Sequence, residues 1–277
     1  MAFRKAVDDT IYAFFLLGQS SYNPRVKVLR IQQSFVRFIP TIILWITSTC
    51  LSVYTLSLEY KIKGGNGESM LMSHLWVVLE QAVAFTIVGS SFGYNYLLPQ
   101  IYLELEMLER ILKHKLKITV DLRQIPLRFR RKMMVIILMH AFTLFTRLPI
   151  VSQNSTFLMG CVYKIQVIVG LLPIYHALFY VTILRQFQLE FSTHVAVVSN
   201  QNFDFGDFTA SGNGGLLRQL RQWRQVHFQL RKCFDIINEY FGWILVTSSL
   251  YMLYYIIWSI YWATVSICEG KSSQFFR

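Results

Sequence analysis

The feature that most constrains this chain is a set of long stretches without a charged residue. Three of them, 38–58, 165–184 and 240–268, are 21, 20 and 29 residues long. A helix rises about 1.5 Å per residue, so about 20 apolar residues cross a hydrocarbon core of about 30 Å. Each stretch therefore predicts a helix that spans a membrane.

Two further apolar stretches each contain one charged residue. Glu80 lies inside the first, and Arg147 lies near the outer end of the second. An Arg side chain at that depth extends to the interface, which reduces the cost of burying its charge. The sequence thus predicts an all-α, polytopic membrane helical bundle. Its five transmembrane helices are placed at about 38–58, 75–98, 133–152, 163–185 and 241–266.

Composition argues against the other fold classes. The chain is 54% hydrophobic and 15% charged with a mean hydropathy of +0.40, whereas soluble domains carry about 25% charged residues. Five such stretches in one chain are not expected of buried helices in a soluble protein. The strands of a membrane β-barrel alternate in polarity over about ten residues, and these stretches do not.

The basic residues predict the orientation. Of the 27 Lys and Arg residues, 21 precede the first predicted span or follow the second and the fourth. Basic loops stay in the cytoplasm, so the amino terminus is expected inside. The expected cytoplasmic segments are 1–37, 99–132 and 186–240, and the expected extracellular ones are 59–74, 153–162 and 267–277. The net charge of +12 then reflects topology and contact with membrane lipids, and it does not indicate nucleic acid.

Several smaller features fit this orientation. No cleavable signal peptide is evident, and the apolar run 11–18 is expected to form an interfacial amphipathic piece. Asn154 begins an Asn-Ser-Thr glycosylation sequon in a predicted outer loop. Cys161 and Cys268 both reach the oxidising face, where a bridge is open to them although unpaired thiols are favoured.

The inner loops are expected to be largely helical. Apolar residues recur at helical spacing over 102–116, which we interpret as the second span continuing into the cytoplasm. Helical patterns also cover 186–198 and 216–240, and the second of these runs into the last span. Between them, 200–215 is rich in Asn, Asp, Gly and Ser and is expected to be flexible.

The sequence shows no catalytic or metal-binding constellation. The six His residues form no H-x-x-x-H pair, and Glu80 is the one acidic residue in any predicted span. His140 and His176 could be ligands, but packed histidines are favoured. We therefore expect neither an enzyme nor a bound metal or cofactor.

Polar residues within the spans are the candidates for a binding site. Ionisable groups at such depth usually face a bundle interior or a water-filled cavity. Aromatic residues in the outer half of the last span could form walls for a small organic ligand. The alternative is an interfacial aromatic belt with hydrogen bonds between helices. The ligand-binding candidates are Glu80, Gln81, Arg147, Gln166, Tyr255 and Trp258.

The layout resembles the insect gustatory receptors over most of the chain. Its most specific part is the run from Leu230 to Leu245, Leu-Arg-Lys-Cys-Phe-Asp-Ile-Ile-Asn-Glu-Tyr-Phe-Gly-Trp-Ile-Leu, followed by an aromatic span that ends Tyr261-Trp262. In that family an Asn near the end of the second inner loop, then an aromatic residue and an apolar run, recur at this place. Insect odorant receptors are similar in architecture.

The resemblance implies a homo- or hetero-tetrameric, non-selective cation channel of the plasma membrane that a small-molecule tastant opens. Family members have seven spans, and the last carries Thr-Tyr, five apolar residues and Gln-Phe. Here Ser273-Gln274-Phe275 lacks the preceding apolar run, so the chain is expected to be a truncated fragment that lacks the pore helix. The alternatives are an odorant receptor or a non-conducting partner subunit. A transporter is less favoured, because no internal repeat is evident.

Overall fold

The computed structural model describes residues 2–19, 22, 24, 38–63, 67–94, 96–145, 154–202 and 213–268. All regular secondary structure in these ranges is helical, as the sequence predicts. In chain order the helices are α1 (Ala2–Leu16), α3 (Ile39–Lys63), α4 (Gly67–Gly93), α5 (Leu97–Lys115), α6 (Gln124–Phe145), α7 (Asn154–Asn202) and α8 (Asn213–Cys268).

The helices that carry the predicted spans are longer than the spans. α7 has 49 residues and α8 has 56, and α8 is unbroken from the predicted inner helix into the predicted last span. Among the described residues, His74–Gly93 and Leu217–Tyr261 are long and apolar enough to cross a membrane, and each contains an 18-residue window with a mean hydropathy of 1.5. The number of spans and the orientation of the amino terminus stay predictions.

The predicted second span differs from the structure at its inner end. α4 ends at Gly93 and α5 begins at Leu97, so the expectation that this span continues directly as a helix into 102–116 is wrong, whereas the bounds of the span stay a prediction. Glycine is a poor helix former. Pro99 lies in the first turn of α5, where its missing N–H would have no helical partner in any case. The local sequence thus favours a helix stop followed closely by a new start.

Two of the predicted outer segments are largely helical. α3 extends to Lys63 and α4 begins at Gly67, so most of the segment 59–74 is helical. α7 begins at Asn154, so the predicted loop 153–162 is helical from its second residue. A helix that has already nucleated adds further residues at little cost, including polar ones. The predicted flexible segment is helical at 200–202 and 213–215, and its remainder lies outside the described residues.

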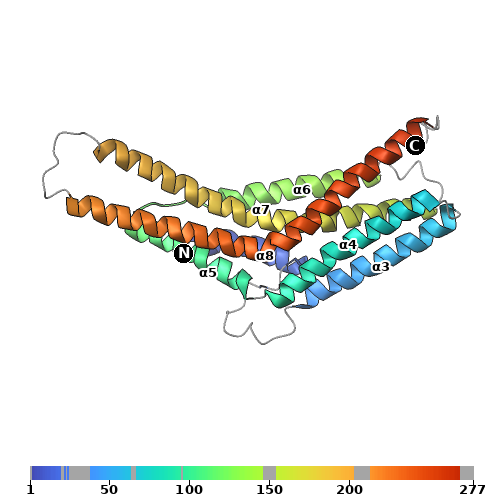
Figure 1. The fold of residues 1–277 in the computed structure, drawn as a ribbon, viewed down its shortest axis with the longest axis horizontal. Helices are drawn as coiled ribbons and strands as arrows, with labels where there is room; N and C mark the ends of the chain where they lie inside the picture. The colour runs from blue at the N-terminus through green and yellow to red at the C-terminus, as the bar shows by residue number, and fades with distance from the viewer. Residues whose placement is uncertain are drawn as a thin grey trace.

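The long helices α7 and α8 run side by side along most of the molecule (Figure 1). α5 packs against the first half of α8, whereas α3 and α4 lie together beside its second half. α6 packs on α7, and α1 lies against α5 and α6. Because α8 is continuous, it joins the two ends of the bundle.

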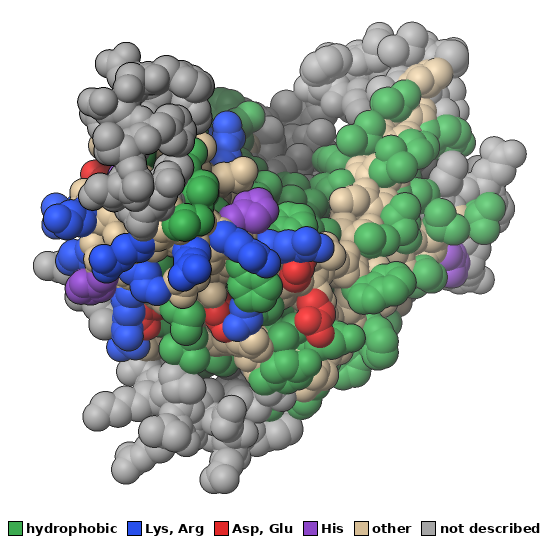
Figure 2. All heavy atoms as spheres, turned by 60° about the vertical axis from the view of Figure 1, so that its left-hand side comes forward, with side chains coloured by type: hydrophobic (Ala, Val, Ile, Leu, Met, Phe, Trp, Pro, Cys, Tyr) green, Lys and Arg blue, Asp and Glu red, His purple; other side chains and the backbone are tan. Residues whose placement is uncertain are grey.

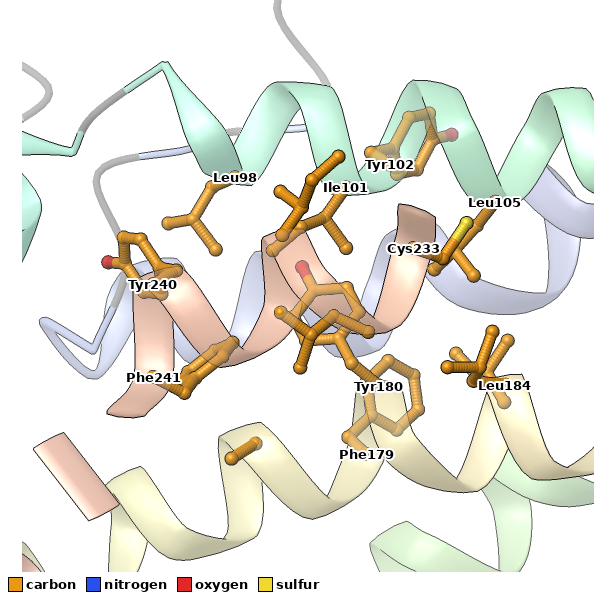
Figure 3. Close-up of a cluster of buried hydrophobic side chains, with 14 of the residues drawn as sticks. Leu98, Ile101, Tyr102, Leu105, Phe179, Tyr180, Leu184, Cys233, Tyr240 and Phe241 are labelled. Atoms are coloured by element: carbon orange, nitrogen blue, oxygen red, sulfur yellow. The ribbon is translucent and has the colours of Figure 1, made fainter. Parts of the chain in front are cut away.

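A buried core lies where α5, α7 and α8 meet, and Figure 3 shows side chains from the three helices converging there. Its largest fully buried side chains include Phe179, Tyr180 and Phe241. α1 adds Val7 and Phe14 to the same core. The amino-terminal helix is therefore amphipathic, as predicted, and its apolar face is packed inside the protein.

Two parts of the molecule have different surfaces. Lys and Arg side chains gather over one part, and hydrophobic side chains cover much of another (Figure 2). We call α1, α5, 124–132 of α6, 186–202 of α7 and 213–240 of α8 the basic half. We call α3, α4 and 241–268 of α8 the apolar half. Its exposed side chains include Val53, Val78, Phe85, Leu253 and Ile260, which are 55–69% exposed, as expected of helices that face lipid.

Candidate functional site

A carboxylate and an amide from α4 are buried against hydroxyl groups of α3. Glu80 is only 3% exposed, and its Oε2 accepts a hydrogen bond from Ser52 Oγ at 2.8 Å. Gln81 Oε1 accepts a hydrogen bond from Thr49 Oγ1 at 2.9 Å, and Gln81 Nε2 donates one to Ser52 Oγ at 3.1 Å. We call these four residues the Glu80 cluster. Its polar groups hold α3 to α4 at a depth where polar side chains are costly.

A group of aromatic side chains lies between α4 and α8. The ring of Trp76 has its centroid 5.0 Å from that of Tyr251, 6.4 Å from that of Tyr254, and 5.5 Å from those of Tyr255 and Trp258. We call these five residues the aromatic column. Trp76 and Tyr251 are 1% and 0% exposed, whereas Tyr255 and Trp258 are half-buried. The column is thus closed at its deep end and more open toward Trp258.

The Glu80 cluster lies at the closed end of the aromatic column. Glu80 follows Trp76 by four residues, so the two share one face of α4 about 6 Å apart along its axis. Thr86 Oγ1 and Thr247 Oγ1 are 2.9 Å apart. Because Thr86 follows Trp76 in α4 whereas Thr247 precedes Tyr251 in α8, the two helices are antiparallel, and this contact lies deeper than the one between Trp76 and Tyr251. Glu80 therefore lies at a level between the Thr86–Thr247 contact and Trp76.

A buried hydroxyl of α8 lies next to the Thr86–Thr247 contact. Ser248 is 0% exposed, and among the described residues its hydroxyl has no hydrogen-bond partner. It follows Thr247 by one residue and therefore lies near the level of the Thr86–Thr247 contact, deeper than Glu80. A buried hydroxyl without a partner costs free energy, and a bound molecule could supply one.

The predicted site residues are brought together in part. Glu80 and Gln81 lie in one cluster, and Tyr255 and Trp258 contact Trp76 one turn away. Arg147 lies outside the described residues. The side chains of Gln166, Asn154, Cys161, Cys268 and His140 also lie outside them, although their backbone is helical.

Sequence reasoning missed the residues that join the two groups. Trp76 stands at the centre of the aromatic column, and Ser52 bonds both Glu80 and Gln81. The signal available was helical spacing, because Trp76 is four residues before Glu80 and Tyr251 is four before Tyr255. Pairing each candidate with its neighbour one turn away would have found Trp76 and Tyr251, whereas Ser52 is on another helix and gives no such signal.

The basic half contains a network of charged groups between α1 and α5. Glu106 is 2% exposed, and its carboxylate accepts hydrogen bonds from Arg4 at 3.1 Å and Arg110 at 3.0 Å. Burial opposes its charge, but the two guanidinium groups outweigh burial and lower the pKa of Glu106. Tyr102 donates a hydrogen bond to Asp8 Oδ1 at 2.6 Å. Burial is the main cause that raises the pKa of Asp8 above its usual value.

A second network joins α5 to α8. Glu104 is 8% exposed and accepts hydrogen bonds from Gln229 and, at 2.6 Å, from Lys232 Nζ. Further along the same interface, Lys115 Nζ donates to Gln225 Oε1 at 2.6 Å. Both contacts lie in the half of α8 that precedes the predicted last span, so polar side chains fix α5 on α8 there.

The described side chains do not assemble a metal centre. No group of three or more His, Cys, Asp or Glu side chains converges among them. His176 packs among aromatic rings, with its centroid 4.3 Å from that of Phe14 and 4.9 Å from that of Phe241. This histidine is therefore a packed one, as the sequence favours. The sites that remain are the Glu80 cluster with the aromatic column and the two networks of the basic half.

Comparison with known families identifies the class of this molecule. The model of the seven-transmembrane chemosensory receptors matches residues 10–277. The chain belongs to this family and is a membrane protein of the chemoreceptor class. No curated protein and no solved structure matches the chain.

Proposed function

We propose that the chain is a taste-receptor subunit that binds a small organic molecule between α4 and α8. Binding would gate a non-selective cation channel of the plasma membrane, which the subunit forms as part of a homo- or hetero-tetramer. The observation that carries the proposal is the Glu80 cluster at the closed end of the aromatic column, within the apolar half of a chemoreceptor. Taste is the sense that the resemblance to gustatory receptors favours.

The chemistry of this site supports a ligand of modest size. Binding sites for small molecules are lined mostly by apolar and aromatic side chains, with a few polar groups that orient the ligand. Here the five rings of the column provide the apolar surface, and the Glu80 cluster provides polar groups one helical turn beyond Trp76. With the amino terminus inside, this level lies in the outer half of the membrane.

The continuity of α8 supports a route from this site to the basic half. Tyr251 contacts Trp76, and the same helix carries Lys232, which binds Glu104 of α5. A rigid helix that changes its position at one end moves the contacts at its other end. We propose that a ligand which shifts α8 at Tyr251 is sensed at the α5–α8 interface.

The test is ligand-evoked calcium influx in cells that express the full chain, alone and with a seven-span relative. The panel contains sugars, amines and neutral aromatics. The site variant is Trp258→Ala, and the matched control is Trp243→Ala, because Trp243 lies on the same helix and is 69% exposed. We expect the site variant to lose at least about tenfold in sensitivity and the control less than about twofold.

Surface labelling of each variant separates loss of binding from loss of expression. Equal responses from the two tryptophan variants at equal surface expression would place the ligand elsewhere. Calcium influx that no ligand of the panel changes would contradict ligand gating.

A further inference from the structure

We propose that the first turns of α6 bind a phospholipid whose headgroup carries phosphate monoesters. The headgroup contacts Arg128, Arg131 and Lys132, which we call the α6 triad, and the acyl chains lie along the apolar residues that follow on the same face of the helix. This inference does not depend on the taste ligand, and it gives the chain a second binding site.

The first argument is the position of the triad on α6. Residues three and four apart in a helix share one face, with their Cβ atoms about 5–6 Å apart, so Arg131 and Lys132 both lie next to Arg128. All three side chains are exposed. Arg128 also donates a hydrogen bond to Gln124 Oε1 at 2.6 Å. Three positive charges are therefore within reach of one headgroup.

The second argument is that nearby carboxylates bind other groups. Glu106 pairs with Arg4 and Arg110, and Asp121, the acidic residue nearest to the triad in the sequence, accepts a hydrogen bond from the backbone N–H of Arg123 at 3.0 Å. Among the residues that the structure describes, the triad forms no ion pair. Its charges are thus available to an anion, and guanidinium groups bind phosphate through strong, often bidentate hydrogen bonds.

The third argument is the surface that continues from the triad. Val135, Leu138, Met139 and Phe142 follow at helical spacing on the same face and are 55–69% exposed. α6 packs on α7 and α1 at the margin of the bundle (Figure 1), and its opposite face carries the buried Phe129. A soluble polyanion or an acidic protein segment would leave the exposed apolar residues in water. A phospholipid supplies an anion and acyl chains side by side, so it matches both parts of this face.

The predicted topology places this change from basic to apolar residues at the inner membrane surface. The expected cytoplasmic segment ends at residue 132, and the expected third span begins at residue 133. The triad then lies at the level of the lipid headgroups, where basic clusters beside a span attract anionic lipids.

The turn that carries the triad is held in place by Phe129. This side chain is 9% exposed, and its ring centroid lies 5.2 Å from that of Phe179 and 6.0 Å from that of Phe14. The packing fixes the backbone between Arg128 and Arg131, so binding a headgroup requires less ordering of the protein.

The charge of the triad favours a phosphorylated headgroup. A phosphate monoester carries a charge of about −1.5 to −2 at pH 7, so one such group can pair with more than one residue of the triad. Phosphatidylserine has a single net negative charge, and its headgroup includes an ammonium group that the triad repels.

The test compares two lipids and one free headgroup on the purified full chain in dodecyl maltoside. The probes are the dioctanoyl forms of phosphatidylinositol 4,5-bisphosphate and of phosphatidylserine, together with inositol 1,4,5-trisphosphate, and calorimetry measures their binding. We expect the bisphosphate lipid to bind at least about tenfold more tightly than either other probe, because it alone combines phosphate monoesters with acyl chains. Equal binding of this lipid and the free headgroup would overturn the lipid as ligand. Equal binding of the two lipids, or binding of neither, would overturn the phosphorylated headgroup.

Two double variants test whether the triad is the site. Arg131→Gln with Lys132→Gln should weaken binding of the bisphosphate lipid at least about tenfold, because both charges face the headgroup. The matched control, Arg221→Gln with Arg224→Gln, removes two charges from exposed positions of α8 and should weaken it less than about twofold. The thermal unfolding temperature without lipid shows whether each variant is folded. If the first does not fold, Arg128→Gln replaces it, with an expected loss of at least about threefold. Equal losses in the triad variant and the control would show that binding follows net charge alone, and would overturn the inference.

Discussion

The helices of the basic half are joined by charged side chains, whereas those of the apolar half are joined by hydroxyls, an amide and aromatic rings. In the basic half, Glu104 binds Lys232 and Glu106 binds Arg4 across helix interfaces. In the apolar half, Thr86 meets Thr247 and Trp76 packs on Tyr251. The same long helix, α8, takes part in both kinds of contact.

The difference follows from what surrounds each half. The arginine and lysine partners in the basic half are 41–53% exposed, so they keep about half of their contact with water while they pair with a buried carboxylate. In lipid such groups would be expensive, and neutral hydrogen bonds and ring packing take their place. Glu80 is the exception in the apolar half, and that exception is the reason to place a ligand there.

The largest effect is expected from the same substitution made at a buried and at an exposed phenylalanine. Phe241 is 1% exposed in the shared core, and Phe85 of the apolar half is 69% exposed. Phe241→Ala should lower the free energy of unfolding by about 3–5 kcal/mol, because it leaves a cavity. Phe85→Ala should change it by less than about 1 kcal/mol. Thermal unfolding in detergent measures both, and equal losses would show that the face of Phe85 is not exposed to lipid or detergent.

The next effect concerns the link between α5 and α8. Glu104→Ala removes the acceptor for Lys232 and for the buried Gln229, and should cost about 1–3 kcal/mol. The matched control is Asp235→Ala, because Asp235 is 65% exposed and 3.9 Å from Arg231. Exposed pairs contribute little, so less than about 0.5 kcal/mol is expected there. Similar losses in a denaturant titration would mean that the basic half does not depend on its buried carboxylates.

A smaller, pH-dependent effect is expected at Glu106. Its pKa is lowered in the folded chain, so its contribution is present above the usual value of 4.5 and is lost as the pH falls below it. Glu106→Gln should therefore cost about 1 kcal/mol at pH 7, a modest figure because Arg4 and Arg110 are half exposed. The cost should vanish in acid. Unfolding temperatures across this pH range measure it, and a loss that is the same at every pH would exclude the charge as its origin.

The smallest effect has the opposite sign. Burial raises the pKa of Asp8, so its ionised form is disfavoured in the folded chain. Asp8→Asn keeps an oxygen that accepts the hydrogen bond of Tyr102 and removes this cost. We expect it to stabilise the chain at pH 7 by less than about 1 kcal/mol, with no gain below the usual pKa of 3.8. Destabilisation at pH 7 would show that Arg4 compensates the Asp8 charge fully.

The sequence was most informative where one physical effect dominated. Spacing of charges located the apolar helices, and helical periodicity predicted that 216–240 runs into the last span, as α8 does. The helix break between Gly93 and Leu97 was missed because an apolar stretch continues through it. Hydropathy does not show where a helix ends within an apolar stretch. Gly93 and Pro99, which lie beside the break, were the better guides.

The binding candidates could be predicted only by type, as polar or aromatic residues within the predicted spans. Depth in the membrane selected Glu80 and Gln81, and aromatic content selected Tyr255 and Trp258. Their connection through Trp76 depends on which face of α4 packs on α8, and these two helices lie far apart in the sequence. The contacts of Glu104 with Lys232 and of Glu106 with Arg4 were not predicted for the same reason, because these partners are on other helices.

The most direct test of this account is the position of each half relative to the membrane. The parent chain has its four native cysteines changed to alanine. One cysteine is then introduced at a time, either at His74 near the start of α4 or at Arg218 in the basic half, and both positions are exposed. A membrane-impermeant maleimide is added to intact cells and then to permeabilised ones. We predict that His74→Cys is labelled in intact cells and that Arg218→Cys is labelled only after permeabilisation. Labelling of both positions in intact cells would contradict the division of the chain into a half within the membrane and a half in the cytoplasm.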